Sequence, residues 1–198
     1  MEIQVYLARW ETAAPAVRAA LEAQLPPERL ERLGRAGGEK RLQAAAAYGL
    51  LRYGLRRLTG TPELPALSYG PHGKPAFLQA SALQFSLSHT TGLAACAFSD
   101  APVGVDVERI RPVPAARARR LGLPARPEDF FALWVERESR LKCRGDGALA
   151  GRRAVPARRG EVYCPLEAGK GYAAGLCAVC ADPVRLVRLS LEELVKET

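Results

Sequence analysis

Two stretches of the chain, GLAACA at residues 92–97 and GYAAGLCA at residues 171–178, decide which fold the sequence predicts. Each is a short apolar run that follows a long helix-like segment and precedes an Asp, a Pro and a Val. Short apolar runs bounded by turn residues are typical of buried strands. Unless the repetition is a chance result of the alanine content, it predicts two similar α/β halves that meet near Pro102.

Each half contains one long segment that predicts a helix. Residues 39–58, EKRLQAAAAYGLLRYGLRRL, place most of their apolar side chains near one face, and Gly60 follows where a helix end favours glycine. Residues 130–144, FFALWVERESRLKCR, form the second helix, and the acidic pair at 128–129 favours its start. Strands are expected at residues 3–7, 85–88, 93–98, 104–110, 161–166, 172–180 and 184–189.

Four shorter segments complete this outline. Residues 16–25 predict a helix that Pro26–Pro27 ends, and residues 68–75, SYGPHGKP, predict a turn-rich loop. Residues 111–129 are rich in Pro and Arg and predict a loop with at most a short helix. Ser190 and Glu193 have the spacing of a capping box, which predicts a final short helix.

The composition, 48% hydrophobic and 25% charged over 198 residues, is typical of a globular protein. No apolar run reaches the roughly 18 residues that a membrane span requires. The start, MEIQVYLARWE, lacks the basic and then apolar pattern of a secretory signal, so we expect a cytoplasmic protein without a membrane partner. The net charge of +8 reflects either a general preference for Arg or an acidic partner.

The five cysteines include one CxxC pair, Cys177 and Cys180, inside an apolar run. We interpret them as buried structural residues; the alternative is zinc or redox chemistry, but no second pair completes a zinc site. With only two histidines in the chain, a histidine-rich metal centre is excluded.

The stretch GVDVERI, residues 104–110, places two acids two positions apart. On a strand, Asp106 and Glu108 point to one face and the neighbouring valines to the other. Adjacent carboxylates disfavour each other's ionised forms unless a cation lies between them. A solvated strand face is the simpler alternative.

A third acid, Glu138, lies on the predicted helix at 130–144, in one stripe with Trp134 and Lys142. Three carboxylates form a hard-oxygen site that suits Mg²⁺, which commonly also binds substrate phosphates. The alternative for this helix alone is an exposed Glu–Lys pair.

Groups that can bind phosphate occur elsewhere in the chain. They are Arg41, Lys74, Ser88, His89 and Lys142. No Walker loop and no GxGxxG motif is present, and no GxSxG motif frames the Ser–His pair as a hydrolase nucleophile and base.

Four stretches in order, GKPAF (73–77), FSLSHT (85–90), GVDVERIRP (104–112) and WVERESRLKCRGDG (134–147), resemble the 4′-phosphopantetheinyl transferase superfamily, in its two-subdomain, Sfp-like class. The resemblance implies an α/β (α+β) fold with a pseudo-twofold pair of subdomains, each a small antiparallel sheet with a long helix. We expect residues 1–102 to form the N-terminal half and residues 103–198 the C-terminal half, which carries the metal-binding motifs.

The resemblance implies a transferase, a holo-[acyl-carrier-protein] synthase, that moves 4′-phosphopantetheine from coenzyme A to a serine of an acyl or peptidyl carrier protein and releases 3′,5′-ADP. The carrier protein would serve fatty acid, polyketide or nonribosomal peptide biosynthesis. The matching positions assign Asp106, Glu108 and Glu138 to Mg²⁺, and Glu138, Asp106 and Lys142 to catalysis, with Glu138 as general base. They assign coenzyme A to Arg41, Lys74, Ser88, His89 and Lys142.

Two positions depart from the family pattern. Arg137 stands where the family usually has lysine, and the segment between Arg111 and Phe130, which in relatives helps to meet the carrier protein, is short. The alternative hypothesis is therefore a homologue that binds coenzyme A or a carrier protein with little or no transferase activity. We expect an acidic carrier protein, no nucleic-acid partner and a monomer. A candidate contact for the carrier protein is the basic run Arg117, Arg119, Arg120 and Arg126.

Overall fold

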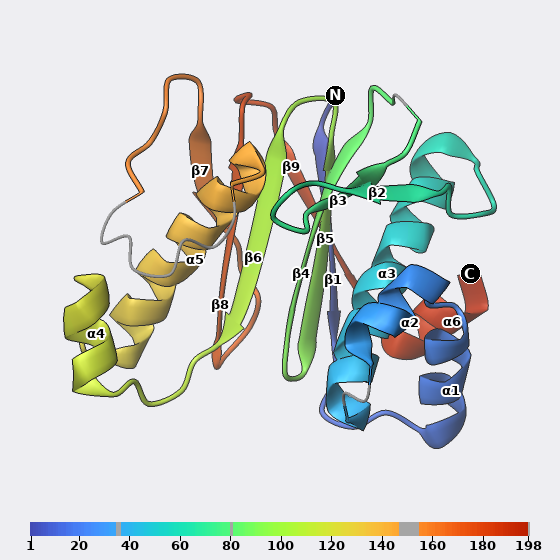
Figure 1. The fold of residues 1–198 in the computed structure, drawn as a ribbon, viewed down its shortest axis with the longest axis horizontal. Helices are drawn as coiled ribbons and strands as arrows, with labels where there is room; N and C mark the ends of the chain where they lie inside the picture. The colour runs from blue at the N-terminus through green and yellow to red at the C-terminus, as the bar shows by residue number, and fades with distance from the viewer. Residues whose placement is uncertain (35–36, 80, 147–154, 198) are drawn as a thin grey trace.

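The computed structural model describes residues 1–34, 37–79, 81–146 and 155–197, which form two main sheets between helices (Figure 1). In spatial order, the first sheet contains β4 (Gln84–Thr90), β5 (Leu93–Ser99), β1 (Ile3–Arg9) and β9 (Val184–Leu189). The second contains β6 (Val103–Arg109), β8 (Tyr172–Ala178) and β7 (Val162–Pro165). A separate pair consists of β2 (Leu67–Tyr69) and β3 (Pro75–Phe77).

The helices are α1 (Pro15–Ala23), α2 (Pro27–Leu33), α3 (Gly38–Thr59), α4 (Ala115–Leu121), α5 (Pro127–Arg144) and α6 (Leu191–Glu197).

The two repeated stretches become β5 and β8, and each lies between two antiparallel neighbours. The long helix α3 packs on β5, and α5 packs on β8. The predicted fold class, a pair of similar α/β halves, is therefore confirmed. One feature adds to it: β9 pairs with β1 in parallel, so the end of the chain completes the first sheet. The boundary at residue 102 stays a prediction.

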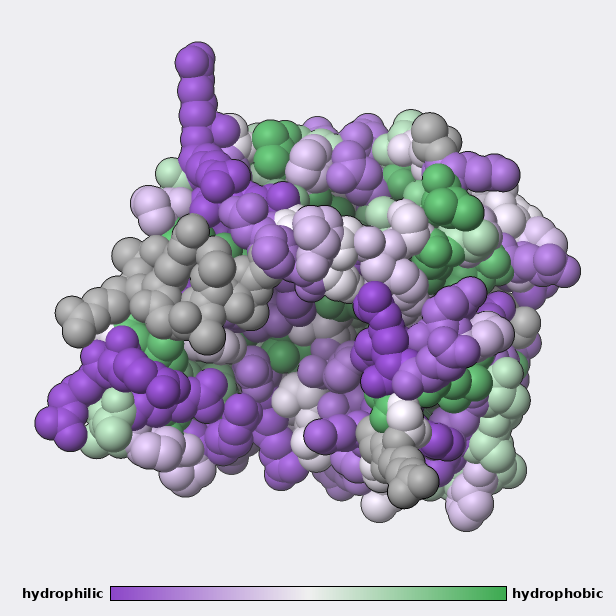
Figure 2. Space-filling view, in the orientation of Figure 1, coloured by the Kyte–Doolittle hydropathy of each residue, from purple (hydrophilic) through white to green (hydrophobic). Residues whose placement is uncertain are grey.

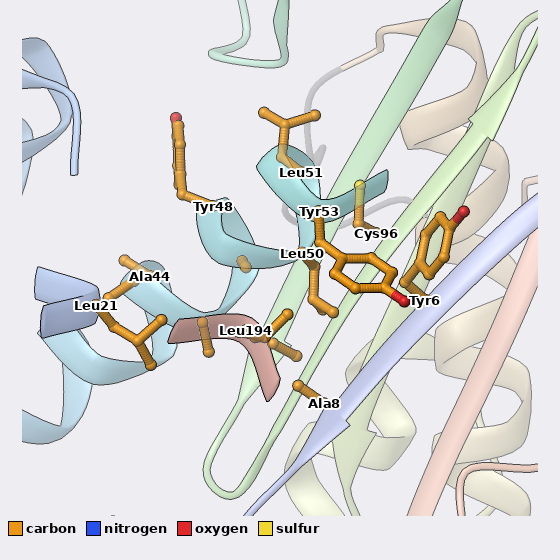
Figure 3. Packing of buried hydrophobic residues seen from close by; sticks show 14 of the residues in the cluster. Tyr6, Ala8, Leu21, Ala44, Tyr48, Leu50, Leu51, Tyr53, Cys96 and Leu194 are labelled. Atoms are coloured by element: carbon orange, nitrogen blue, oxygen red, sulfur yellow. The ribbon is translucent and has the colours of Figure 1, made fainter. Parts of the chain in front are cut away.

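The alternation of side chains along the strands produces four layers. Ile3, Val5 and Leu7 of β1 share one apolar cluster with Val103, Val105 and Val107 of β6, so the two sheets face each other. The other face of the first sheet packs on α3, where Leu50 and Leu51 lie near Tyr6 and Cys96 (Figure 3). The order of layers is therefore α3, first sheet, second sheet, α5.

The structure differs from the sequence prediction in two connecting segments and agrees with it in a third. Residues 27–33 form α2, because a proline suits the first turn of a helix as well as the end of the preceding one. The predicted loop at 68–75 is the connection of the β2–β3 pair. The segment 111–129 contains one short helix, α4, as predicted, and its last three residues already belong to α5.

The predicted capping box at the start of α6 is confirmed. The Glu193 backbone N–H donates to Ser190 Oγ at 3.1 Å, and the Ser190 N–H donates to Glu193 Oε2 at 2.7 Å. All five cysteines are free thiols. The prediction of burial holds for Cys177 in the second sheet and for Cys96 and Cys143, whereas Cys180 and Cys164 are only partly buried. Among the described residues, no helix has both the length and the apolarity to span a bilayer.

Candidate active site

The two sheets meet where β4 and β6 lie side by side, and hydroxyl groups join them. Alternate residues of β4 point toward β6, so three hydroxyls accept hydrogen bonds from successive outward N–H groups of that strand. The bonds are Val105 N–H to Ser86 Oγ (3.1 Å), Val107 N–H to Ser88 Oγ (3.2 Å) and Arg109 N–H to Thr90 Oγ1 (3.3 Å). Side chains therefore take the place of backbone carbonyls at this seam, which satisfies the buried N–H groups of Val105 and Val107.

The acids of β6 lie on the face that meets α5. Gly104 makes this possible, because an added Cβ would lie 2.1 Å from the Ser139 carbonyl oxygen and 2.3 Å from the Cys143 backbone nitrogen. The helix backbone thus approaches the strand closely at Gly104. Two residues further along, Asp106 is 6% exposed and faces the same helix. The predicted separation of valines and acids on opposite faces is therefore present in the structure.

Asp106 connects the two halves. Its Oδ1 atom accepts hydrogen bonds from Lys142 Nζ of α5 at 2.7 Å and from Ser88 Oγ of β4 at 2.9 Å. Its Oδ2 atom is buried and has no hydrogen-bond partner within the part of the chain that the structure describes. A buried carboxylate oxygen without a partner costs free energy, so Oδ2 is an acceptor available to a cation or a donor.

Two lysines reach across the seam in opposite directions. Lys142 of the C-terminal half also donates to the Leu87 carbonyl of β4 at 3.2 Å, and Lys74 of the N-terminal half donates to the Val103 carbonyl of β6 at 2.9 Å. Burial lowers the pKa of Lys74, and the positive charge of Lys142 lowers it further. The site therefore holds two cationic groups next to its acids.

Glu138 lies close enough to the two strand acids to feel their charge. Its pKa is raised, mainly by burial and then by Asp106, with a smaller effect of Glu108, while Lys142 and Arg137 oppose the increase. Glu108 itself accepts a hydrogen bond from Arg111 Nη1 at 2.9 Å. The structure thus brings the three predicted carboxylates into one neighbourhood.

The three acids do not form a closed metal cage. In the described ranges, no three His, Cys, Asp or Glu side chains are grouped closely enough to hold a metal ion. The donor chemistry nevertheless suits a hard divalent cation, since it offers carboxylate oxygens. One of them is the buried Oδ2 of Asp106, to which no group in the described part of the chain donates. A cation would have to share these oxygens with Lys142 and Arg111.

The acids border a cleft made of two adjoining cavities of about 310 Å³ and about 230 Å³. Both cavities are lined by Gly73, Pro75, Leu87 and Lys142. Asp106, Glu108, Ser88 and His89 line the larger cavity, and Glu138, His72 and Lys74 line the smaller one. Nearly all residues predicted from the sequence for metal and coenzyme A therefore surround this cleft.

Arg41 is the exception. Its guanidinium Nη2 donates to the Gly34 carbonyl at 3.0 Å, and Arg41 does not line either cavity of the cleft. Its assignment as a nucleotide contact stays a prediction.

The structure adds residues to the cleft that the sequence did not indicate. Arg29 of α2 lines the larger cavity, together with Tyr48 and Tyr69, whose hydroxyls lie 3.2 Å apart. The guanidinium of Arg32 lies 3.9 Å from the centre of the Tyr69 ring. Burial, and then the hydrogen bond with Tyr69, raise the pKa of Tyr48. The sequence shows that residues 27–33 contain Arg29 and Arg32, but it does not show that this segment is a helix beside the cleft. Only the position of α2 next to the larger cavity indicates that these arginines can bind a ligand there.

His89 is held neutral in this cleft. Burial, and then the positive charges of Arg29 and Lys142, lower its pKa to about 4. The Nδ1 atom of the ring lies 3.2 Å from Oε1 of Gln43, a buried residue of α3 that the sequence did not indicate.

Comparison with known proteins places the chain in a family. Over 141 residues it is 33% identical to the 4′-phosphopantetheinyl transferase AcpT of Escherichia coli strain K12, which covers 64% of this chain and 68% of AcpT. The chain belongs to the 4′-phosphopantetheinyl transferase family. The predicted resemblance is thereby confirmed.

Other members of the family match shorter or less similar parts. The 4′-phosphopantetheinyl transferase psf-1 of Bacillus pumilus is 35% identical over 102 residues, which is 46% of this chain and 44% of psf-1. The 4′-phosphopantetheinyl transferase Sfp of Bacillus subtilis strain 168 is 28% identical over 152 residues, 63% of this chain and 68% of Sfp. The chain thus spans less than half the length of psf-1. No protein-family model matches the chain.

Proposed function

We propose that this phosphopantetheinyl transferase homologue moves the 4′-phosphopantetheine group from coenzyme A to a serine of an acyl or peptidyl carrier protein and releases 3′,5′-ADP. The observation that carries the proposal is the cleft between the halves, where three carboxylates stand beside Lys142 and a set of phosphate-binding groups. The names of its relatives, all 4′-phosphopantetheinyl transferases, support the same reaction.

In the proposed reaction, the serine hydroxyl oxygen bonds to the phosphorus next to the pantetheine, and the bond from that phosphorus to the leaving 3′,5′-ADP oxygen breaks. The serine proton passes to Glu138, directly or through a water molecule. Burial and the neighbouring acids raise the pKa of Glu138, so its carboxylate is a stronger base than an exposed glutamate. Lys142 stabilises negative charge on the phosphate oxygens.

Asp106, Glu108 and Glu138 are the residues that would hold Mg²⁺. When bound, the ion neutralises charge on the pyrophosphate, which is the main catalytic contribution a divalent cation makes to phosphoryl transfer. The buried Oδ2 of Asp106, which has no hydrogen-bond partner among the described residues, supports this assignment.

The cavities offer a place for each part of the nucleotide end of coenzyme A. Arg29 and Arg32 provide positive charge near the larger cavity, His89 provides a neutral hydrogen-bonding ring, and Tyr48 and Tyr69 provide aromatic faces. We assign the phosphates and the adenosine of coenzyme A to this cavity. The predicted contacts Lys74, Ser88 and Lys142 lie at the seam beside it.

The test is the intact mass of purified apo carrier proteins after incubation with the chain, coenzyme A and Mg²⁺. We expect a mass increase equal to one phosphopantetheine group on the carrier serine, and no increase when Mg²⁺ is replaced by a chelator. If no member of a panel from fatty acid, polyketide and nonribosomal peptide synthesis is modified, while coenzyme A still binds, the alternative of a binding homologue without transfer activity is correct.

A further inference from the structure

The side-chain amide of Gln43 joins α3 to the end of β4 at the edge of the cleft. Its Nε2 atom donates to Glu39 Oε1 at 3.2 Å and lies 3.5 Å from Thr91 Oγ1. Its Oε1 atom lies 3.2 Å from His89 Nδ1. Gln43 is only 9% exposed, so this amide has little access to water as an alternative partner.

The partners of this amide determine where its two ends point. A carboxylate only accepts hydrogen bonds, so the amide end that faces Glu39 must be the NH₂ group. The opposite end, which faces His89, is then the carbonyl oxygen, and it too only accepts. Nδ1 of His89 must therefore be the donor and must carry a hydrogen.

His89 is neutral in the free protein, because burial and the charges of Arg29 and Lys142 lower its pKa to about 4. A neutral imidazole has one N–H group, and its position is set by the hydrogen bond of the other nitrogen. In water the neutral histidine side chain favours hydrogen on Nε2. The protein environment here imposes the opposite form.

We propose that Gln43 is a positioning residue that holds His89 with its hydrogen on Nδ1, so that Nε2 is the nitrogen left for a phosphate monoester in the cleft. The ligand assignment rests on the proposed function, whereas the state of the ring does not. A phosphate monoester titrates with a second pKa of about 6, so it enters partly as the form that carries one P–O–H group. That proton is shared with, or moves to, Nε2, and no other reactant is consumed. The ring then donates from both nitrogens, to Gln43 and to the phosphate.

The state of the ring is measurable because the chain has only two histidines. His72 is exposed and serves as the internal reference. A long-range ¹H–¹⁵N correlation spectrum of the uniformly labelled full chain at pH 7 distinguishes the two neutral forms from each other and from the cation. We expect a protonated Nδ1 and an unprotonated Nε2 for His89, whose signals are compared with those of His72. A His89 spectrum with the hydrogen mainly on Nε2, or with both nitrogens protonated, would overturn the proposal.

Variants of Gln43 test whether this residue is the cause. Gln43→Leu keeps the size and removes the acceptor, so the His89 signals should move toward the form with hydrogen on Nε2. Gln43→Glu keeps an acceptor and should retain the hydrogen on Nδ1. The matched control is Gln4→Leu, which removes a similar Gln–Glu hydrogen bond of 2.8 Å on β1, away from the cleft lining. An unchanged His89 spectrum in Gln43→Leu would contradict the assigned role.

A second variant covers the case in which Gln43→Leu fails to fold. Glu39 is exposed at the first turn of α3, and Glu39→Gln removes the carboxylate that fixes the direction of the amide. The Gln43 amide can then turn over, and His89 should show both neutral forms. A His89 spectrum that stays with hydrogen on Nδ1 alone would contradict the orientation argument.

Binding of 3′,5′-ADP, measured by calorimetry, connects the ring to the ligand. Loss of the hydrogen bond that orients the His89 ring should weaken binding by about fivefold in Gln43→Leu, whereas binding by Gln4→Leu should stay unchanged. Unchanged binding together with a changed ring would overturn the ligand part of the proposal. If the ring is as expected but no carrier protein is modified in the mass assay, only the proposed function fails.

Discussion

The two halves share one plan but attach their long helices to their sheets in different ways. The helix α3 is buried through small and apolar side chains, including the run Ala44 to Ala47 and Leu50, all at most 1% exposed. It packs on the first sheet and also on α1 and α6, and Figure 3 shows Ala44 beside Leu21 of α1. The helix α5 also buries apolar side chains, such as Val135 and Leu141, but it adds buried charged and polar groups. Arg137, Ser139 and Arg140 are each at most 8% exposed.

The C-terminal half also contains buried ion pairs between arginines of α5 and Glu161. Glu161, at the start of β7, accepts hydrogen bonds from Arg144 Nη2 at 2.6 Å and from the Arg158 backbone N–H at 2.9 Å. Arg140 bridges Glu161 and Glu136 at 3.5 Å and 2.9 Å. We conclude that the N-terminal half supplies an apolar support, whereas the C-terminal half carries the cost of buried ion pairs on α5, the helix that also bears Glu138 and Lys142.

The largest expected effect is on transfer activity, from a change to the acid at the seam. Asp106→Asn keeps the size of the side chain and can still bond to Ser88, but it removes the charge that faces Lys142 and the proposed cation. We expect the rate of carrier modification to fall about 1,000-fold, which corresponds to several kcal/mol of lost transition-state stabilisation. The measurement is the mass assay with initial rates.

The control for this variant is Asp182→Asn, which should leave the rate unchanged. Asp182 is a partly exposed acid whose carboxylate lies 3.7 Å from the amino group of Met1. Circular dichroism should show that both variants fold. A near-normal rate for Asp106→Asn would show that this carboxylate is not part of the catalytic machinery.

The next effect compares close contacts in the two halves. In the C-terminal half the glycine is on the strand: a Cβ at Gly104 would meet backbone atoms of α5 at 2.1 Å and 2.3 Å. In the N-terminal half it is on the helix: a Cβ at Gly54 would meet the Phe98 ring at 2.2 Å and the Tyr6 ring at 2.8 Å. Backbone cannot move aside as rings can, so Gly104→Ala should lower the free energy of unfolding by about 3 kcal/mol.

Gly54→Ala should cost about 1 kcal/mol, because the strain is partly offset by the higher helix propensity of alanine. Urea denaturation of both variants gives the comparison. Equal losses would mean that the helix of the C-terminal half adjusts as readily as the rings of the N-terminal half.

Acid should weaken the C-terminal half first. The hydrogen bond from Arg144 lowers the pKa of Glu161 to about 2 from the usual value near 4.5. A carboxylate with a lowered pKa in the folded state contributes its full stabilisation above the unfolded pKa, and loses it as the pH falls from about 4.5 to about 2. Glu161→Gln should therefore lower the free energy of unfolding at pH 7 by about 2–3 kcal/mol and flatten its pH dependence in that range.

Hydrogen exchange at pH 4 and pH 3 checks the location of this effect. Amides of α5 and β7 in the unaltered chain should lose protection before those of α3. If both helices lose protection together, the ion pairs around Glu161 do not limit the stability of the C-terminal half.

The sequence predicts the regular parts of this molecule well. The alternation of Val103, Val105 and Val107 with acids identifies both the strand and its two faces, and the structure retains both. The prediction from sequence is wrong for the shortest elements. The three residues of β2 are too few to show a periodicity, and Pro27 can end one helix or begin the next.

The role of Gln43 could not be predicted for a different reason. Gln43 lies next to alanines on the buried side of α3, and the sequence around it does not indicate which group its amide would contact. Only the packing of α3 against the end of β4 brings its amide to His89. Residues that act through a neighbour from another element leave no pattern in the sequence.

The smallest expected effect concerns how the C-terminal half meets its proposed partner. Hydrophilic side chains gather over α4 (Figure 2), where Arg119 and Arg120 are exposed. Arg117 instead lies 5.3 Å from the Trp134 ring, and Arg126 pairs with Glu128, so these two arginines of the predicted run have contacts within the chain. Exposed charges change association more than turnover, and salt screens them.

Arg119→Ala should therefore raise the KM for an acidic carrier protein about threefold at low salt, with kcat unchanged. The difference should disappear as salt is raised. The matched control is Arg185→Ala on β9, an exposed arginine of the first sheet, which should leave KM unchanged at any salt concentration. Equal effects of the two substitutions would mean that net charge, and not a surface of the C-terminal half, attracts the carrier protein; no effect of either would exclude α4 as the contact.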